Sequence, residues 1–126
     1  MSALRVLISD DDVMIRDVLR EVLDSEPDIA VVAVAGDADE AIRLAERHRP
    51  AVAVLDVRMP GGGGARAARE IARLSPDTAI LAFSAYADRA SIAGLAAAGV
   101  TEYLVKGTPN TAIIEAVRRL GRQAAG

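Results

Sequence analysis

The chain has 126 residues, a length typical of one domain, and 52% of them are apolar but only 2% are aromatic. Its 18 acidic and 15 basic residues give a net charge of −3, and because no cysteine is present, disulfides, thiolate metal sites and cysteine nucleophiles are excluded. Without a signal peptide, a basic field or an apolar run near the roughly 20 residues that span a bilayer, we expect a cytoplasmic domain that contacts neither membrane nor nucleic acid directly.

Strand and helix signals alternate along the chain. Short apolar runs predict strands at Leu4–Ile8, Ile29–Ala35, Ala51–Leu55, Ala79–Phe83 and Tyr103–Val105. Apolar residues at helical spacing predict helices at Met14–Leu23, Ala38–Arg47, Ala65–Leu74, Arg89–Ala98 and Ala112–Leu120. Five strands, each followed by a helix, indicate an α/β fold with a parallel sheet covered on both faces. We expect the flavodoxin-like doubly wound arrangement, with strand order 2-1-3-4-5.

Capping residues mark several of these boundaries. Asp37 with Glu40 has the spacing of a capping box for the second helix, and Thr108 before a proline predicts a cap for the fifth. The last residues are small and polar, which predicts a frayed end. We therefore expect one domain over residues 1–121, with residues 122–126 as a C-terminal tail or the start of a linker.

Polar side chains follow four of the five predicted strands at the point where each strand ends. They are Asp10 with Asp11, then Asp56, Ser84 and Lys106. In a right-handed doubly wound sheet of order 2-1-3-4-5, these ends share one edge, and the first and third strands are neighbours. The three aspartates are therefore expected in one crevice, with the serine and the lysine on its far side.

Three carboxylates beside one lysine predict a site for a hard cation. Mg²⁺ prefers oxygen ligands and is often held by a few carboxylates together with a phosphate. A carboxylate can also act as a nucleophile and form an aspartyl phosphate, and Asp56 is the natural choice because it stands alone between the acidic pair and the lysine. Mg²⁺ and Lys106 would offset the charge of the entering phosphoryl group, and Ser84 would donate a hydrogen bond to one of its oxygens.

Two neighbouring motifs are assigned to structure rather than to chemistry. Asp12, directly after the acidic pair, is interpreted as the N-cap of the first helix in preference to a third metal ligand. The run Gly61–Gly64 predicts a flexible loop after the third strand. It is not a phosphate-binding P-loop, because no Gly-Lys-Ser/Thr follows it at the required spacing.

With these residues in place, the chain resembles the response-regulator receiver domains of two-component signalling. The matching segments are Val6–Asp11, Val54–Gly61, Ala82–Ala85 and Ala98–Lys106. They match the family's opening strand with its acidic pair, its phosphoacceptor segment, its Ser/Thr-Ala switch, and its last strand with an aromatic residue and a lysine. The resemblance runs from about Leu4 to Leu120, and the segments are highly specific when taken together in this order.

The resemblance implies a role for each residue around the crevice. Asp56 resembles the phosphoacceptor, and Asp10 and Asp11 resemble the pair that binds Mg²⁺ together with it. The backbone carbonyl of Arg58 would supply another metal ligand, which leaves its side chain free to vary.

A second group of residues would bind the phosphoryl group and report its presence. Lys106, Ser84 and the backbone of Ala85 would contact its oxygens. On phosphorylation Ser84 would turn inward, and Tyr103 would change rotamer with it. That coupling would alter the surface formed by the fourth helix, fifth strand and fifth helix, the family's usual partner surface.

The resemblance therefore implies a signalling role rather than turnover of a substrate. The domain would take a phosphoryl group from a sensor histidine kinase and control an output domain or protein, with a homodimer as one form of the phosphorylated state. Beyond Mg²⁺-dependent self-phosphorylation and self-dephosphorylation, no enzyme activity is expected. The pair Lys106-Gly107 is similar to the branch of the family that carries helix-turn-helix outputs.

Three other functions compete with this one. A phosphatase of the haloacid dehalogenase type needs a second aspartate two residues after the nucleophile, where this chain has Arg58. A flavodoxin would need a loop rich in Ser, Thr and Gly after the first strand, and the acidic loop here would repel a phosphate. A receiver fold that works as an interaction module without phosphorylation is the remaining alternative.

Two side chains predict a long phosphoryl lifetime. Arg58 lies two residues after the acceptor and Tyr86 two residues after the switch serine, so both would overhang the phosphoryl group and obstruct attack by water. Slow self-dephosphorylation is expected, with faster decay in Arg58→Ala or Tyr86→Ala. Decay followed by mass spectrometry checks this, and equal rates in both variants and the parent would contradict it.

Overall fold

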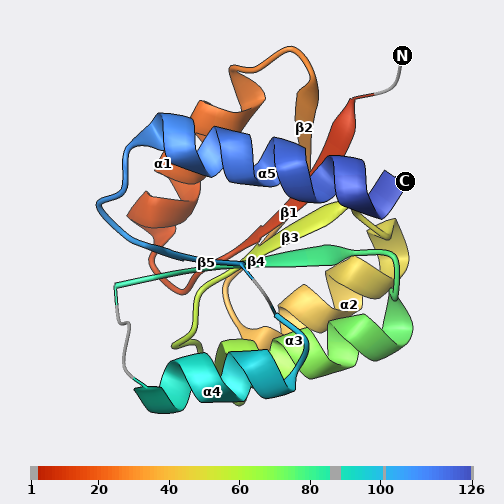
Figure 1. The fold of residues 1–126 in the computed structure, drawn as a ribbon, viewed down its shortest axis with the longest axis vertical. Helices are drawn as coiled ribbons and strands as arrows, with labels where there is room; N and C mark the ends of the chain where they lie inside the picture. The colour runs from red at the N-terminus through yellow and green to blue at the C-terminus, as the bar shows by residue number, and fades with distance from the viewer. Residues whose placement is uncertain (1–2, 86–88, 101, 126) are drawn as a thin grey trace.

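The computed structural model describes residues 3–85, 89–100 and 102–125 (Figure 1). Within these ranges the strands are β1 (Leu4–Ser9), β2 (Ile29–Ala35), β3 (Val52–Leu55), β4 (Ala79–Ser84) and β5 (Glu102–Val105). The helices are α1 (Val13–Asp24), α2 (Ala38–His48), α3 (Gly63–Leu74), α4 (Arg89–Ala97) and α5 (Asn110–Ala125). No helix in these ranges is long and apolar enough to cross a membrane.

All neighbouring strands pair in parallel, in the order β2-β1-β3-β4-β5, which confirms the predicted doubly wound sheet. The central strand β3 is buried along its whole length, because helices cover both faces of the sheet. A strand enclosed in this way carries a continuous apolar run and no alternation of apolar and polar residues. The sequence of β3 has this pattern. Because the strands are parallel, their carboxyl ends lie at one edge of the sheet.

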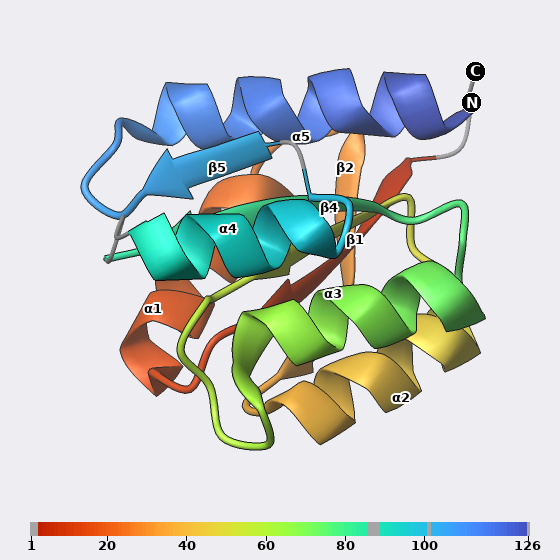
Figure 2. The same ribbon diagram turned by 60° about the horizontal axis from the view of Figure 1, so that its bottom comes forward.

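The helices form two layers around the sheet. Figures 1 and 2 show α1 and α5 on one face and α2, α3 and α4 on the other. Two apolar cores result, one on each face of the sheet. Successive residues of a strand point to opposite faces, so Leu7 belongs to one core while Val6 and Ile8 belong to the other.

The two predicted acidic caps are both present. The Asp12 carboxylate accepts hydrogen bonds of 2.9 and 3.3 Å from backbone N–H groups in the first turn of α1, so its role as an N-cap is confirmed. At the start of α2, the Asp37 carboxylate accepts from the Glu40 backbone N–H at 2.8 Å. The Glu40 side chain reaches back to the backbone N–H of Gly36 at 2.9 Å, one residue before the usual position in a capping box.

Helix α5 differs from the expectation at both ends. The Thr108 hydroxyl donates to the carbonyl of Val105, closing the turn after β5, and the helix begins at Asn110. At the other end, α5 continues to Ala125, so the predicted end at residue 120 is wrong. Glycine has a low helix propensity, which predicted the earlier end. In the structure a Cβ at Gly121 would lie 2.0 Å from a methyl carbon of Leu4. Close packing of the glycine against that side chain outweighs its low helix propensity.

One residue at the end of α2 stores backbone strain. Arg49 has φ of +45°, the left-handed conformation in which a side chain costs roughly 1 kcal/mol, and it precedes Pro50. We expect Arg49→Gly to raise the free energy of unfolding by about 0.5 kcal/mol, as measured by urea denaturation.

The matched control is Arg47→Gly, which places glycine inside the last turn of the same helix and should lower the free energy of unfolding by about 1 kcal/mol. A loss of stability in Arg49→Gly would show that the arginine side chain contributes more than its strained backbone costs.

Candidate functional site

Backbone hydrogen bonds that continue beyond the strands fix the positions of the predicted site residues. The N–H of Asp10 donates to the last carbonyl of β2 at 3.1 Å, and the N–H of Asp56 donates to the carbonyl of Ser9 at 2.9 Å. The N–H of Lys106 donates to the carbonyl of Ser84 at 2.9 Å. Each residue is therefore held by the neighbouring strand, and the crevice is assembled by the sheet itself.

The three predicted carboxylates come together at this edge. One oxygen from each of Asp10, Asp11 and Asp56 lies within 4.8 Å of the others. Asp10 and Asp56 are almost fully buried, with 1% and 5% of their surfaces exposed, while Asp11 faces solvent. Buried carboxylates at this spacing repel one another, and a divalent cation would remove that repulsion.

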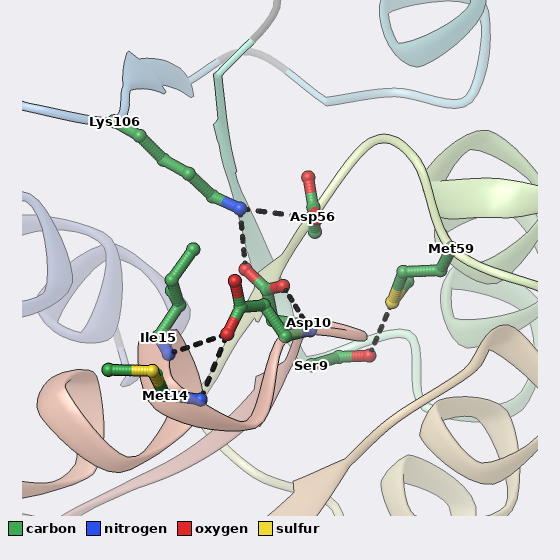
Figure 3. Close-up of polar contacts among 8 residues, drawn as sticks. Ser9, Asp10, Met14, Ile15, Asp56, Met59 and Lys106 are labelled. Carbon is green, nitrogen blue, oxygen red and sulfur yellow. Dashed lines mark hydrogen bonds and ion pairs between the residues drawn. The ribbon is translucent and has the colours of Figure 1, made fainter.

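Lys106 reaches across the crevice to both buried acids. Its Nζ atom lies 2.7 Å from Oδ2 of Asp10 and 3.2 Å from Oδ2 of Asp56 (Figure 3). The side chain is mostly buried, and this desolvation alone would lower the pKa of the ammonium group; the two carboxylates outweigh it, so the net pKa is raised and Lys106 stays charged. The lysine therefore neutralises one of the three negative charges.

The pKa of Asp56 is also raised, which for a carboxyl group disfavours the charged form. Burial raises its pKa, and the charge of Asp10 raises it further. The ion pair and hydrogen bond with Lys106 and a hydrogen bond from the Ser84 side chain oppose this rise without cancelling it. A carboxylate in such a site is poorly solvated, which favours reaction with an electrophile once its charge is balanced.

The donor set fits a hard cation. Among the described residues, Oδ2 of Asp10 is buried and accepts no well-directed hydrogen bond, although it forms the ion pair with Lys106. Because this one ammonium group is shared between two buried carboxylates, a cation in the crevice would balance the remaining negative charge. Carboxylate oxygens are the ligands that Mg²⁺ prefers. Arg58 is exposed in the loop after β3, and the metal-binding role of its carbonyl stays a prediction.

The segment from the end of β3 to the first turn of α3 contains site features that the sequence did not reveal. A Cβ at Gly64 would lie 2.5 Å from the carbonyl oxygen of Asp56, so only glycine allows α3 to start this close to that residue. The buried Met59 receives a hydrogen bond from the hydroxyl of Ser9. Gly64 thus has a steric reason, and no local pattern in the sequence pointed to the contact between Ser9 and Met59, which are 50 residues apart.

The residues predicted to form the switch occupy different surroundings. Ser84 is fully buried and already contacts Asp56. The Tyr103 hydroxyl is buried without a hydrogen-bond partner among the described residues, and its ring packs against the core formed with α2, α3 and α4. Their change on phosphorylation stays a prediction, as does the role of the Ala85 backbone. Tyr86 lies outside the described residues.

Removal of the Tyr103 hydroxyl tests whether that group destabilises the folded protein. A buried hydroxyl without a partner destabilises a protein, so we expect Tyr103→Phe to raise the free energy of unfolding by about 1 kcal/mol. Thermal unfolding checks this, with a rise in Tm of roughly 4 °C for a domain of this size. A lower Tm would mean that the hydroxyl has a favourable partner.

Comparison with known proteins gives one consistent result. Residues 6–118 match the family model described as a response regulator receiver domain. The chain is 31% identical over 115 residues to the transcriptional regulatory protein DegU of Brevibacillus brevis, covering 91% of this chain and 49% of that protein. It is 41% identical over 104 residues to PdtaR of Mycobacterium tuberculosis, covering 81% of this chain and 49% of that protein. The chain thus spans about half the length of these curated relatives.

Solved structures agree with the sequence relatives. The receiver domain of the response regulator NarL from Mycobacterium tuberculosis superposes with a TM-score of 0.90 at 31% identity, covering 97% of this chain and 98% of that one. A LuxR-family two-component response regulator from Aurantimonas superposes with a TM-score of 0.89 at 30% identity, covering 97% and 87%. DegU and the NarL receiver domain confirm the predicted likeness to the branch with helix-turn-helix outputs.

Proposed function

Because this chain belongs to the response regulator receiver domain family, we propose that it accepts a phosphoryl group on Asp56 in a Mg²⁺-dependent reaction. The observation that carries this proposal is the position of Asp56. Its carboxylate is buried at a strand end, lies within 4.8 Å of two other carboxylates, and is contacted by Lys106. A single reactive carboxylate with two acids and one cation around it has the parts needed for phosphoryl transfer to an aspartate.

In the proposed reaction, an oxygen of Asp56 attacks the phosphorus of a phosphorylated donor. The new O–P bond forms as the bond from phosphorus to the donor's leaving group breaks, and the leaving group departs with the electron pair. Lys106 already lies between Asp10 and Asp56, so its ammonium group is placed to pair with the incoming phosphoryl oxygens. Mg²⁺ held by Asp10, Asp11 and Asp56 would supply charge neutralisation to the same oxygens.

The proposed donor is a sensor histidine kinase, whose phosphohistidine must come within bonding distance of Asp56. An apolar groove of about 310 Å³ beside the site supports docking of a protein partner. It runs between α1 and the start of α5, and Lys106 is at its rim. Val13, Met14 and Val18 of α1 are also exposed, although they are large and apolar. Exposed apolar side chains beside a functional site are typical of partner surfaces.

The proposed output is a change at the surface formed by α4, β5 and α5. Ser84 contacts the acceptor from β4, and Tyr103 lies on the neighbouring strand β5, so a shift of the serine toward a phosphoryl group can reach that surface. Its consequence would be control of an output domain or protein, or formation of a homodimer. We also propose that Arg58 lengthens the lifetime of the phosphoryl group, because its side chain is exposed close to the acceptor.

The proposal is tested by incubating the protein with acetyl phosphate and measuring its intact mass. With Mg²⁺ present, we expect a gain of one phosphoryl group that maps to the peptide containing Asp56; with EDTA, we expect no gain. If neither condition produces an adduct, the phosphorylation-independent interaction module becomes the better description. An adduct that forms equally well in EDTA would reject the metal requirement alone.

A further inference from the structure

A buried side-chain contact joins the two segments that build the acidic site. The hydroxyl of Ser9 donates a hydrogen bond to Sδ of Met59 at 2.9 Å (Figure 3). Both side chains are buried, with 2% and 7% of their surfaces exposed. Ser9 is the last residue of β1 and directly precedes Asp10, while Met59 lies three residues after Asp56.

Ser9 holds the segment after β3 at both of its ends. Its backbone carbonyl accepts from the N–H of Asp56 at 2.9 Å, and its hydroxyl donates to Met59. The four residues 56–59 between these contacts include the acceptor and the carbonyl of Arg58. One residue of β1 therefore fixes both the start and the end of the segment that faces the acidic pair.

The chemistry of the contact indicates a role in geometry more than in stability. A thioether sulfur is a weak hydrogen-bond acceptor, so the bond itself adds little to the folded state. A buried hydroxyl that lacks a partner, in contrast, destabilises the folded state, so folding favours keeping Ser9 and Met59 in contact. A weak bond with a costly alternative restrains where the loop lies, because moving Met59 away would leave the hydroxyl of Ser9 unsatisfied.

We propose that Ser9 is a positioning residue for the metal site and that it acts through Met59. The inference rests on the proposed function, because it takes Mg²⁺ to bind at Asp10, Asp11 and Asp56. Ser9 sets the distance between the acidic pair and the segment 56–59. Groups that orient metal ligands without touching the metal are established contributors to metal affinity.

The test is a double-mutant cycle of Ser9→Ala, Met59→Leu and the double variant in the full chain, because leucine keeps most of the volume of methionine but cannot accept the bond. Titration with MgCl₂, followed by backbone amide NMR shifts, measures the Mg²⁺ affinity of each protein. We expect each single variant to bind Mg²⁺ about threefold to tenfold more weakly than the parent. The double variant should bind no more weakly than the weaker single variant, because both changes remove the same contact.

The control is Ser75→Ala, at the opposite edge of the sheet. Ser75 is also 2% exposed, and its hydroxyl is hydrogen-bonded to that of Thr78 at 2.7 Å. This variant removes an equally buried serine hydroxyl, so its free energy of unfolding should fall while its Mg²⁺ affinity stays that of the parent. A purely structural role of Ser9 would make Ser9→Ala behave in the same way, and that result would overturn the proposal.

Denaturation in EDTA examines the contact independently of the metal. Met59→Leu should lower the free energy of unfolding more than the double variant does, because only the single variant leaves a buried hydroxyl without an acceptor. Equal losses would show that the contact does not exist and would overturn the proposal. If the parent protein binds no Mg²⁺, the proposed function and the positioning role fail together; if it binds and Ser9→Ala binds equally well, only the positioning role fails.

Discussion

Asp56→Asn is expected to abolish the covalent adduct and, in metal-free buffer, to raise the free energy of unfolding. The adduct is lost because the amide cannot act as the nucleophile. The free energy of unfolding rises because the side chain buried beside Asp10 is now neutral, while Lys106 keeps its ion pair with Asp10. A gain of about 1 kcal/mol is expected at neutral pH, equivalent to roughly 4 °C in Tm.

The pH dependence of this gain follows from the direction of the Asp56 pKa. Burial first, and then the charge of Asp10, raise that pKa in the folded protein. Folding therefore disfavours the ionised carboxylate, and this penalty is fully present above the folded pKa. It is lost as the pH falls through the folded pKa and then below the unfolded pKa. The advantage of Asp56→Asn in thermal unfolding with EDTA should accordingly shrink as the pH is lowered through this range.

Asp77→Asn is the matched control, because it removes the same charge from an exposed loop position before β4. Its effect on the free energy of unfolding should stay within about 0.5 kcal/mol at any pH. If Asp56→Asn were less stable than the parent at neutral pH, the contacts of the carboxylate with Lys106 and Ser84 would have to outweigh the cost of burying it.

Gly64→Ala is expected to lower the free energy of unfolding by about 2 kcal/mol in urea denaturation. The added Cβ would lie 2.5 Å from the carbonyl oxygen of Asp56 and 3.0 Å from the Cα of Val57. Both atoms belong to the backbone, so no side chain can rotate to relieve the clash. Because relief requires a shift of Asp56 itself, the variant should also bind Mg²⁺ more weakly.

Gly94→Ala provides the comparison for this substitution. A Cβ at Gly94, within α4, would lie 3.7 Å from the Cβ of Ala65, which is an ordinary contact. The better helix propensity of alanine should then raise the free energy of unfolding by up to about 1 kcal/mol. Equal stability of Gly64→Ala and the parent would show that α3 can move away from Asp56 without cost.

Most of the fold follows from patterns that are local in the sequence. The buried runs and the helical periodicities are each contained within a few turns or one strand, and so are the acidic caps at Asp12 and Asp37. The end of α5 could not be predicted in this way. It depends on how Gly121 packs against Leu4, at the other end of the chain, and no local pattern contains that contact.

The sequence by itself determined which residues meet at the site, because parallel strands that alternate with helices must bring their carboxyl ends to one edge. Asp10, Asp56 and Lys106 could be named for that reason. The tertiary structure decided how they are arranged: which acids are buried, that the lysine contacts two of them, and that Ser9 and Gly64 pack against the segment that follows β3. Two of these contacts, Ser9 with Met59 and Lys106 with Asp56, join residues 50 positions apart, and such distances are fixed only when the sheet and its helices are assembled.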